Sequence, residues 1–199
     1  MNQQLENRLI EIIKKDLWMM DVLKTVRDLK LNDCWIGAGF VRNKVWDIIH
    51  EIDRTELNDI DVIYFNKSNT TKDFDLAIED KLRIINPDLN WSVKNQSRMN
   101  VRNGHKEYDD CNDAISFWPE TATSIAVRLN FEDQIDYLAP YGLEDLFNLL
   151  VIPTPNFDLT VYNERIEKKR WKEKWCKLEI KTDDNTKNSS TENAKRLIF

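Results

Sequence analysis

Asp59 and Asp61 are the residues whose type and spacing most directly indicate chemistry. They open the run Asp59–Phe65, whose β-branched and aromatic content predicts a buried strand. Residues two apart in a strand point to the same side, with Cα atoms roughly 6.6 Å apart, so both carboxylates share a face with Ile63 and Phe65. A second acid in a buried strand is costly unless something compensates it. The pattern therefore predicts a site for one or two Mg²⁺ or Mn²⁺ ions beside a phosphate-bearing substrate.

A glycine-rich turn, Gly37-Ala38-Gly39, ends the apolar run Cys34–Ile36 and precedes a helical pattern that begins near Phe40. The start of a helix presents free backbone N–H groups and the positive end of the helix dipole, and both suit phosphate. Taken alone, the turn is more typical of a tight connection with glycine at positive φ than of a phosphate site. If the two strands are antiparallel, however, the turn and the aspartates meet at one end of the sheet.

Two other phosphate-binding patterns fit less well. Nothing in the chain matches the P-loop pattern Gly-x-x-x-x-Gly-Lys-Ser/Thr. The dinucleotide pattern Gly-x-Gly-x-x-Gly fails at its third glycine, where the chain has Arg42, and its acidic residue should close the second strand. Asp59 and Asp61 open that strand instead. The comparison favours phosphoryl chemistry over dinucleotide binding.

Hydrophobic periodicity predicts the elements that position these residues. The N-terminal part reads as two helices, or as one helix bent near Asp16. Further helices are predicted at about 40–50, 72–85, 96–103, 110–117, 142–150 and 162–175. Strands are predicted at 34–36, 59–65, 91–95, 124–129 and 134–138, the last two as a hairpin. This order predicts an α/β (α+β) fold with a mixed sheet flanked by helices, plus a C-terminal helix.

Within the helix predicted at 72–85, four apolar side chains are expected to point inward. They are Phe74, Leu76, Ala77 and Leu82. The length of 199 residues, the 41% hydrophobic content and the seven tryptophans fit one domain, predicted to span residues 1–181 with its core at about 34–150. The polar tail, 182–199, is predicted to be disordered.

Charge and cysteine content narrow the functional classes. A net charge of -6 argues against a protein that grips a long nucleic-acid backbone by simple attraction. The basic cluster Lys168–Arg170 is interleaved with Glu167 and Glu173, which favours a solvated helix face over an RNA-binding surface. The sequence shows no apolar run near the ~20 residues of a membrane span, no signal-peptide core and no paired cysteine spacing. These features predict a cytoplasmic protein without membrane contact.

The two motifs together resemble those of the DNA-polymerase-β nucleotidyltransferase superfamily, which has a strand ending in Gly-Gly/Ser, a helix, and Asp-x-Asp/Glu in a hydrophobic strand. The chain is more closely similar to a family of small bacterial nucleotidyltransferase-like proteins, over about residues 34–175. The matching stretches are Gly37–Asn43, Val45–Asp47, Asp59–Val62, Trp91–Gln96, Trp118–Thr123 and Ala139–Leu143. The resemblance implies metal-dependent transfer of a nucleotidyl group from a nucleoside triphosphate, with Asp59 and Asp61 as metal ligands.

The resemblance also implies a third carboxylate on a later strand, which helps to activate the attacking hydroxyl. The matching strand, Trp91–Asn95, offers Ser92 and Asn95 but no acid. Glu120 or Asp136 is expected to supply this carboxylate from elsewhere. A further departure is Asn100, where relatives are expected to carry a histidine.

Several polar residues are candidates for nucleotide binding besides Gly37, Ala38 and Gly39. Arg42 follows the turn at the start of its helix. Lys94 and Asn95, followed by Gln96 and Arg98, form a polar run with the chemistry to bind a triphosphate or a base, or to face solvent. The sequence leaves open a non-catalytic nucleotide-binding domain and an RNA-binding module. The acceptor, whether a small molecule, RNA or protein, stays unidentified.

Overall fold

The computed structural model describes residues 2–155 and 157–182. The helices are α1 Gln3–Lys14, α2 Leu17–Arg27, α3 Gly39–His50, α4 Lys72–Ile85, the short 3-10 helix η1 Gln96–Arg98, α5 Met99–Asn103, α6 Cys111–Ser116, α7 Glu144–Phe147, α8 Leu159–Lys169 and α9 Trp171–Lys174. The strands are β1 Trp35–Gly37, β2 Ile60–Tyr64, β3 Trp91–Asn95, β4 Ala126–Leu129, β5 Ile135–Leu138, β6 Leu150–Val151 and β7 Glu179–Ile180. Apart from residue 182, the tail predicted to be disordered lies outside the described residues.

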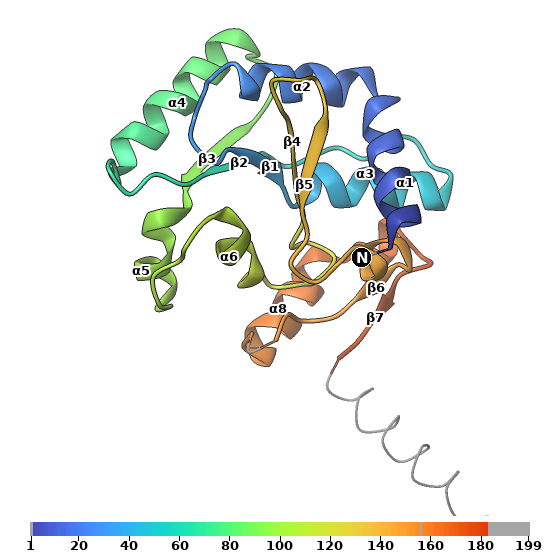
Figure 1. The fold of residues 1–199 in the computed structure, drawn as a ribbon. Coiled ribbons are helices and arrows are strands. Elements are labelled where there is room, and N and C mark those ends of the chain that lie inside the picture. The colour runs from blue at the N-terminus through green and yellow to red at the C-terminus, as the bar shows by residue number, and fades with distance from the viewer. Residues whose placement is uncertain (1, 156, 183–199) are drawn as a thin grey trace, which may run out of the picture.

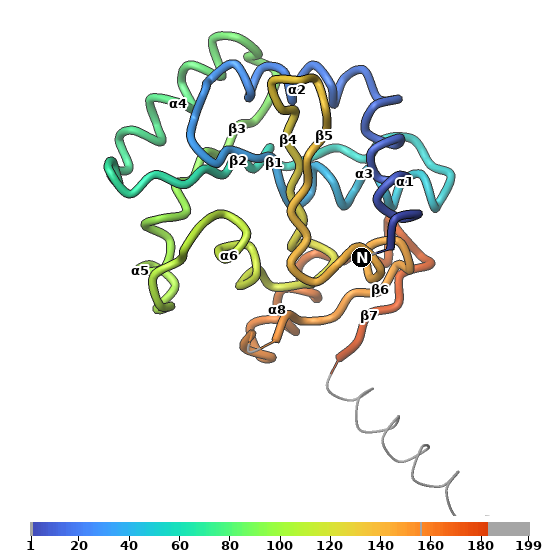
Figure 2. The backbone as a smooth tube through the Cα atoms, viewed as in Figure 1, coloured from blue at the N-terminus to red at the C-terminus, as the bar shows by residue number. Residues whose placement is uncertain are grey.

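Five strands form one mixed sheet in the order β3-β2-β1-β4-β5, which confirms the predicted fold class. The pairs β1–β2, β1–β4 and β4–β5 are antiparallel, whereas β2 and β3 are parallel. The predicted hairpin is present, and Figure 2 shows its two strands running side by side. Since Ile36 pairs with Val62, the next register step places Gly37 across from Asp61. The glycine turn and the aspartates therefore meet at one end of the sheet.

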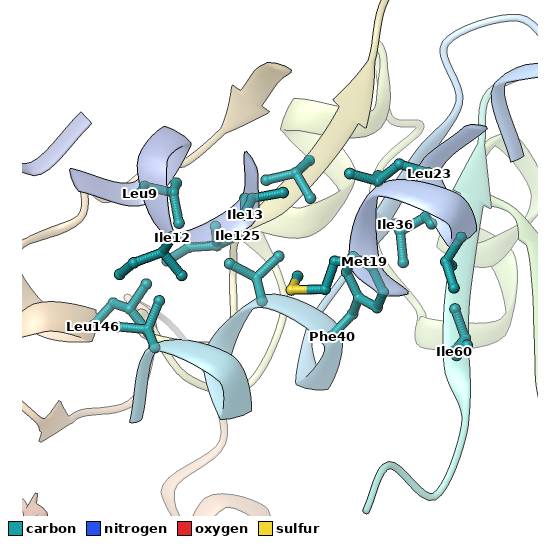
Figure 3. Packing of buried hydrophobic residues seen from close by; sticks show 14 of the residues in the cluster. Leu9, Ile12, Ile13, Met19, Leu23, Ile36, Phe40, Ile60, Ile125 and Leu146 are labelled. Atoms are coloured by element: carbon teal, nitrogen blue, oxygen red, sulfur yellow. The ribbon is translucent and has the colours of Figure 1, made fainter. Parts of the chain in front are cut away.

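One face of the sheet carries the main hydrophobic core. Ile36 of β1, Val62 of β2 and Val127 of β4 point to this face and are fully buried. Figure 3 shows Ile36 of β1 among Met19 and Leu23 of α2 and Phe40 of α3, which belong to the same core. The alternation that buries Ile60, Val62 and Tyr64 here sends Asp61 and Ile63 to the opposite face.

The opposite face of the sheet is covered by a smaller hydrophobic cluster. Trp35, Ile63 and Phe65 pack there against α6, which contributes Cys111 and Ile115 among others. In Figure 1, α5, α6 and α8 lie on the other side of the sheet from α2 and α4. Asp61 thus opens onto the face where helical cover is limited, and the predicted sharing of a face by Asp61, Ile63 and Phe65 agrees with this packing.

The inward face of α4 differs from the prediction. Leu76 and Ala77 are exposed, whereas Asp75 and Glu79 are buried. The reason is that β3 is an edge strand with backbone N–H groups that need partners. Glu79 Oε1 accepts from the N–H of Val93 at 2.9 Å, and Asp75 Oδ1 accepts from that of Asn95 at 3.3 Å. Two carboxylates therefore serve as the outer hydrogen-bonding partners of the sheet edge.

Two of the predicted helices have different bounds in the structure. The predicted helix at 162–175 is divided into α8 and α9 at Arg170, whose φ of 47° interrupts the helix. The predicted helix at 142–150 is reduced to α7, and the chain then forms β6, which pairs in parallel with β7. At the N-terminus there are two helices, because the Asp16 side chain caps α2 by accepting from the N–H of Met19 at 3.1 Å.

Among the described residues, no helix is both long and apolar enough to cross a membrane.

Candidate functional site

Asp59, Asp61 and the glycine turn line one small cavity of about 110 Å³ at the end of the sheet, called here the polar cavity. Its lining includes Ala38 and Gly39 from the turn, and Arg165 and Lys169 from a much later part of the chain. Asp59 lies just before β2 and is exposed, while Asp61 lies within the strand and is partly buried. The C-terminal helix α8 therefore completes a site that the sequence motifs place on the sheet.

Gly37 and Gly39 have different roles. A Cβ on Gly37 would lie 2.6 Å from Cη2 of Trp118, so glycine is required here by side-chain packing. A Cβ on Gly39 would meet nothing closer than 3.4 Å, from Leu57 Cδ2. Gly37 was predicted to bind nucleotide, but it does not line the polar cavity and packs against the Trp118 indole instead. Gly39 keeps its place at the cavity surface.

Ala38 adopts an unusual backbone conformation at the start of α3. Its φ of 53° and ψ of -119° lie in a region that glycine reaches freely and a Cβ disfavours. Its N–H donates to the carbonyl of Ile125 at 3.1 Å, and no side chain caps the first turn of the helix. The first-turn N–H groups of α3 consequently face the cavity end without a capping side chain, as anion binding requires.

We expect Ala38→Gly to stabilise the protein. The strain of a non-glycine residue in this region is about 1–3 kcal/mol, and the added flexibility of glycine in the unfolded chain offsets about 0.5–1 kcal/mol of the gain. A net gain of about 1 kcal/mol would raise the melting temperature by about 2–4 °C. Ala77→Gly in the exposed middle of α4 is the matched control and should lower stability by about 1 kcal/mol. If thermal melts show that Ala38→Gly and Ala77→Gly lower the melting temperature equally, the backbone of Ala38 is not strained.

Asp61 is the most perturbed carboxylate of the site. Burial and the negative charge of Asp59 raise its pKa from 3.8 to about 6, against opposing effects of Ser92, Lys94 and Arg42. The Ser92 hydroxyl hydrogen-bonds to the Asp61 side chain from the neighbouring strand, where Asp61 and Ser92 are register partners. The charge of Asp59 next to the Asp61 carboxyl is a favourable arrangement for a divalent cation, which would relieve their repulsion.

Arg42 lies deeper than expected for a residue that binds phosphate by itself. Its guanidinium donates to Thr123 Oγ1 and to Asn43 Oδ1, each at 2.9 Å, and it stacks 4.4 Å from the centre of the Trp171 ring. Burial lowers its pKa to about 10. The Nε of Arg42 has no hydrogen-bond partner among the described residues. Arg42 places a fixed positive charge beneath the cavity that it lines.

Arg165 and Lys169 were not predicted as site residues. They are one helical turn apart on α8, so both face the cavity. Arg165 Nε donates to the fully buried Glu120 at 2.5 Å, which fixes the guanidinium in place. The pKa of Lys169 is lowered by partial burial and by the positive charges of Arg165 and Arg42. Three cations held this close together favour a polyanionic ligand.

The expected third carboxylate is not at the site. Glu120 is buried behind Arg165 and does not line the polar cavity. Asp136 lies on β5, three strands from β2 and therefore roughly 14 Å away, and pairs with Arg128 at 2.9 Å. Both expectations are corrected in this way. Among residues 2–155 and 157–182, no cluster of three or more His, Cys, Asp or Glu side chains could hold a metal ion.

Lys94 and Asn95 separate in the structure. Lys94 shares the face of Asp61, and its Nζ donates to the Val93 carbonyl at 3.0 Å. Asn95 was predicted to bind nucleotide, but it is fully buried at the opposite end of β3. Its side chain donates to the carbonyls of Asn66 and Asn69 at 2.7 and 2.8 Å, and it accepts from the N–H of Asn66 at 3.0 Å. These bonds give Asn95 a structural role.

A second cavity of about 230 Å³ adjoins the first and is called here the aromatic cavity. Ala38, Asp61 and Arg165 line both cavities. Beyond this junction, the walls of the aromatic cavity include Phe117 and Trp118, the two residues that follow α6. The two cavities together form one site. The tryptophans that line the polar cavity, Trp171 and Trp175, are buried, whereas Phe117 and Trp118 of the aromatic cavity are partly exposed.

Comparisons with known proteins were consistent with this geometry. A family model described as "Nucleotidyltransferase" matches residues 24–180. An NMR structure described as revealing a CCA-adding enzyme head domain is 37% identical, with a TM-score of 0.79, and the match covers 88% of this chain and 95% of that chain. No match was found among curated proteins.

More distant structures share the fold alone. A CCA-adding enzyme in complex with CTP is 15% identical, with a TM-score of 0.58 over 96% of this chain and 47% of that chain. The Thermotoga maritima CCA-adding enzyme complexed with tRNA_CCA is 14% identical, with a TM-score of 0.55 over 92% of this chain and 43% of that chain. The chain thus spans less than half the length of these two proteins.

Proposed function

Because the chain belongs to the nucleotidyltransferase family, we propose that it transfers a nucleotidyl group from a nucleoside triphosphate to an acceptor hydroxyl, with a divalent cation at Asp59 and Asp61. The observation that carries this proposal is the polar cavity, in which two mutually repelling carboxylates face a helix start and four cations, Arg42, Arg165, Lys169 and Lys174. The carboxylates suit Mg²⁺ or Mn²⁺, and the cations with the backbone amides suit a triphosphate.

The residues present fit a divalent cation on the chemistry of their donors. Asp59 and Asp61 offer hard oxygen ligands from one side, and Mg²⁺ at a triphosphate needs one or two protein carboxylates, its remaining ligands being phosphate oxygens and water. When bound, such a cation neutralises phosphate charge and lowers the pKa of the attacking hydroxyl. Ser92 orients the Asp61 carboxylate by its hydrogen bond.

The chain's own groups account for substrate binding and charge stabilisation. In this proposal the first-turn N–H groups of α3 and the Lys169 ammonium bind the β- and γ-phosphates. Arg165, held by Glu120, faces the α-phosphate at the junction of the two cavities. The reaction forms a bond from the acceptor oxygen to the α-phosphorus and breaks the bond from that phosphorus to pyrophosphate, and the hydroxyl proton leaves to water.

Metal binding at Asp61 is expected to depend on pH. The raised pKa means that the folded, metal-free protein holds a proton on Asp61 up to about pH 6, and a metal must displace it. Below that pKa, Mn²⁺ affinity should fall about tenfold for each pH unit, and above it the affinity should level off. Titrating Mn²⁺ without nucleotide between pH 5 and 8 avoids protonation of the triphosphate. An affinity that stays flat across this range would contradict a metal bound through Asp61.

A non-catalytic nucleotide-binding protein is the second candidate, and one observation favours it. Ser92 stands beside Asp61 on the strand where the resemblance implies a third carboxylate. A protein without that acid could bind nucleotide and metal but transfer the nucleotidyl group slowly. Turnover by Ser92→Glu together with none in the wild-type protein would establish this second reading.

The acceptor is not fixed by the cavity. A structural neighbour is complexed with tRNA_CCA, which makes an RNA 3′ end one class to test beside small molecules and proteins. On α8, Arg165 and Lys169 line the polar cavity, whereas Lys168 and Arg170 are exposed and are paired with Glu164 and Glu173. Cys34, Cys111 and Cys176 are unpaired, which fits a reducing compartment, and we place the activity in the cytoplasm.

The proposal is tested first by binding. The purified protein is titrated with each of the four NTPs in the presence of Mg²⁺, Mn²⁺ or a chelator. The affinity is measured by isothermal titration calorimetry or by equilibrium dialysis. We expect NTP binding that needs the metal and is lost in Lys169→Ala. Binding that is equal with the chelator and with the metal would refute the metal assignment, and no binding under any condition would refute the proposed function.

A further inference from the structure

We propose that the aromatic cavity receives the nucleobase of the donor nucleoside triphosphate, with the carboxamide of Gln96 bonded to the edge of the base. The inference rests on the proposed function, because it assigns the other half of the same substrate. It adds a second subsite on α5, α6 and the end of β3, which the glycine and aspartate motifs do not reach.

The order of the two cavities matches the order of groups in a nucleoside triphosphate. Besides the shared Arg165, the polar cavity is lined by the cations Arg42, Lys169 and Lys174, whereas the aromatic cavity adds only Lys94, which is paired with Glu79. Asp61 and Arg165 lie between the two, where both cavities meet. In nucleotidyl transfer the α-phosphate joins pyrophosphate on one side to the nucleoside on the other. With pyrophosphate among the cations, the nucleoside extends into the aromatic cavity.

The walls of this cavity suit a flat heterocycle. Phe117, Trp118 and Met99 line it and are all partly exposed. The Phe117 ring is held by the rings of His105 and Tyr108, with centroids at 4.6 and 5.2 Å. Aromatic side chains stack on nucleobases, and the flexible thioether of Met99 can adapt to the base beside them. The volume of about 230 Å³ is below the roughly 300–1,000 Å³ of drug-sized sites and fits one base.

Gln96 provides a polar group aimed into the cavity. Its side chain is 5% exposed and lines the cavity, and its Nε2 donates to the Lys94 carbonyl at 3.2 Å. This bond fixes the orientation of the amide. The Oε1 atom accepts no hydrogen bond from another residue in the described part of the chain. This acceptor is therefore available to a ligand, and an amino group or ring N–H of a base can donate to it.

The test compares nucleotides with inorganic tripolyphosphate, which carries the same charges but has no base. Affinities for the four NTPs and for tripolyphosphate are measured with Mg²⁺ in the wild type, Phe117→Leu and Gln96→Met. The matched control is Phe131→Leu, an aromatic residue that is 75% exposed on the hairpin and lines neither cavity of the site.

We expect Phe117→Leu to weaken all four NTPs about 5- to 50-fold while tripolyphosphate binding stays unchanged. Gln96→Met should change the ratio of affinities among the four bases by about tenfold, again without affecting tripolyphosphate. Phe131→Leu should match the wild type. Retention of the wild-type fold in each variant is verified by its melting temperature before titration, and Gln96→Met keeps the inference testable if Phe117→Leu fails to fold.

Other outcomes separate this inference from the proposed function. If the wild type binds NTPs no more tightly than tripolyphosphate, or if both variants bind all NTPs normally, the base does not occupy this cavity and the inference is overturned. If the variants raise only the KM of an acceptor, the cavity binds that acceptor, and the inference is overturned as well. If neither NTPs nor tripolyphosphate bind to any form, the proposed function itself fails.

Discussion

Asp61→Asn is expected to abolish metal-dependent nucleotidyl transfer and, at the same time, to stabilise the metal-free protein. The loss of turnover should be about 10³-fold or more, because the metal's stabilisation of the transition state is worth several kcal/mol and each 1.36 kcal/mol is tenfold in rate. A gain in stability distinguishes this residue from an ordinary structural aspartate, whose replacement destabilises the protein.

The stabilisation has a definite sign and pH window. Because the folded-state pKa of Asp61 is raised from 3.8 to about 6, the folded protein binds the proton more tightly than the unfolded chain, and stability falls as pH rises through this range. Above it, the buried charge lowers the free energy of unfolding by about 2 kcal/mol, since the carboxylate keeps some solvent contact. Removing that charge should raise the melting temperature by about 4–8 °C at pH 7.5.

Thermal melts in a chelator at pH 7.5 and pH 5 check this prediction. The gain for Asp61→Asn should shrink at pH 5, where the wild-type carboxyl is largely protonated. Asp136→Asn is the matched control, since Asp136 forms a partly exposed ion pair with Arg128 on the outer strand. That variant should change stability by about 1 kcal/mol or less and keep full turnover. Destabilisation of Asp61→Asn at pH 7.5 would show that Asp61 is structural.

The second large effect is expected at the buried pair of Glu120 and Arg165. Arg165→Met leaves a fully buried carboxylate without its partner and should lower the free energy of unfolding by about 3–5 kcal/mol. Glu120→Gln leaves Arg165 without its anchor, so the KM for NTP should rise more than kcat falls. This split identifies Glu120 as a positioning residue and not as the third metal ligand.

The double variant Glu120→Gln/Arg165→Met separates folding from binding. With no charge left unpaired, it should recover most of the stability lost in Arg165→Met, because a buried pair contributes little net stability compared with neutral side chains. NTP binding should not recover, since the cation is absent. Arg128→Met breaks a partly exposed pair and should cost only about 0.2–1 kcal/mol. Recovery of NTP affinity in the double variant would show that Arg165 does not contact the substrate.

The sequence predicted the sheet well because its strands carry strong local signals. β3 and α4 have the predicted bounds, and the meeting of the glycine turn with Asp61 follows from one antiparallel pairing. The inward face of α4 was predicted correctly for Phe74 and Leu82 but not for Leu76 and Ala77. Apolar content favoured Leu76 and Ala77, whereas the edge of β3 requires the carboxylates of Asp75 and Glu79.

Half of the site could not be predicted from local patterns. Arg165 and Lys169 lie about 100 residues after Asp61 in the chain, and Arg165 is held there by the buried Glu120. The one available signal was the spacing of four residues between the two cations, which places them on one helix face. Glu120 was predicted for the site but in another role, because sequence shows an acid and not its partner.

Isotope transfer tests the central claim most directly. The wild-type protein is incubated with Mn²⁺ or Mg²⁺, a cell extract as the source of acceptors, and each NTP labelled either at the α-phosphate or at the γ-phosphate. Nucleotidyl transfer predicts that the α-label becomes attached to an acceptor while the γ-label is released in pyrophosphate, and that neither occurs with Asp59→Asn or Asp61→Asn. Attachment of the γ-label to the acceptor, or equal labelling by the wild type and both variants, would contradict the account.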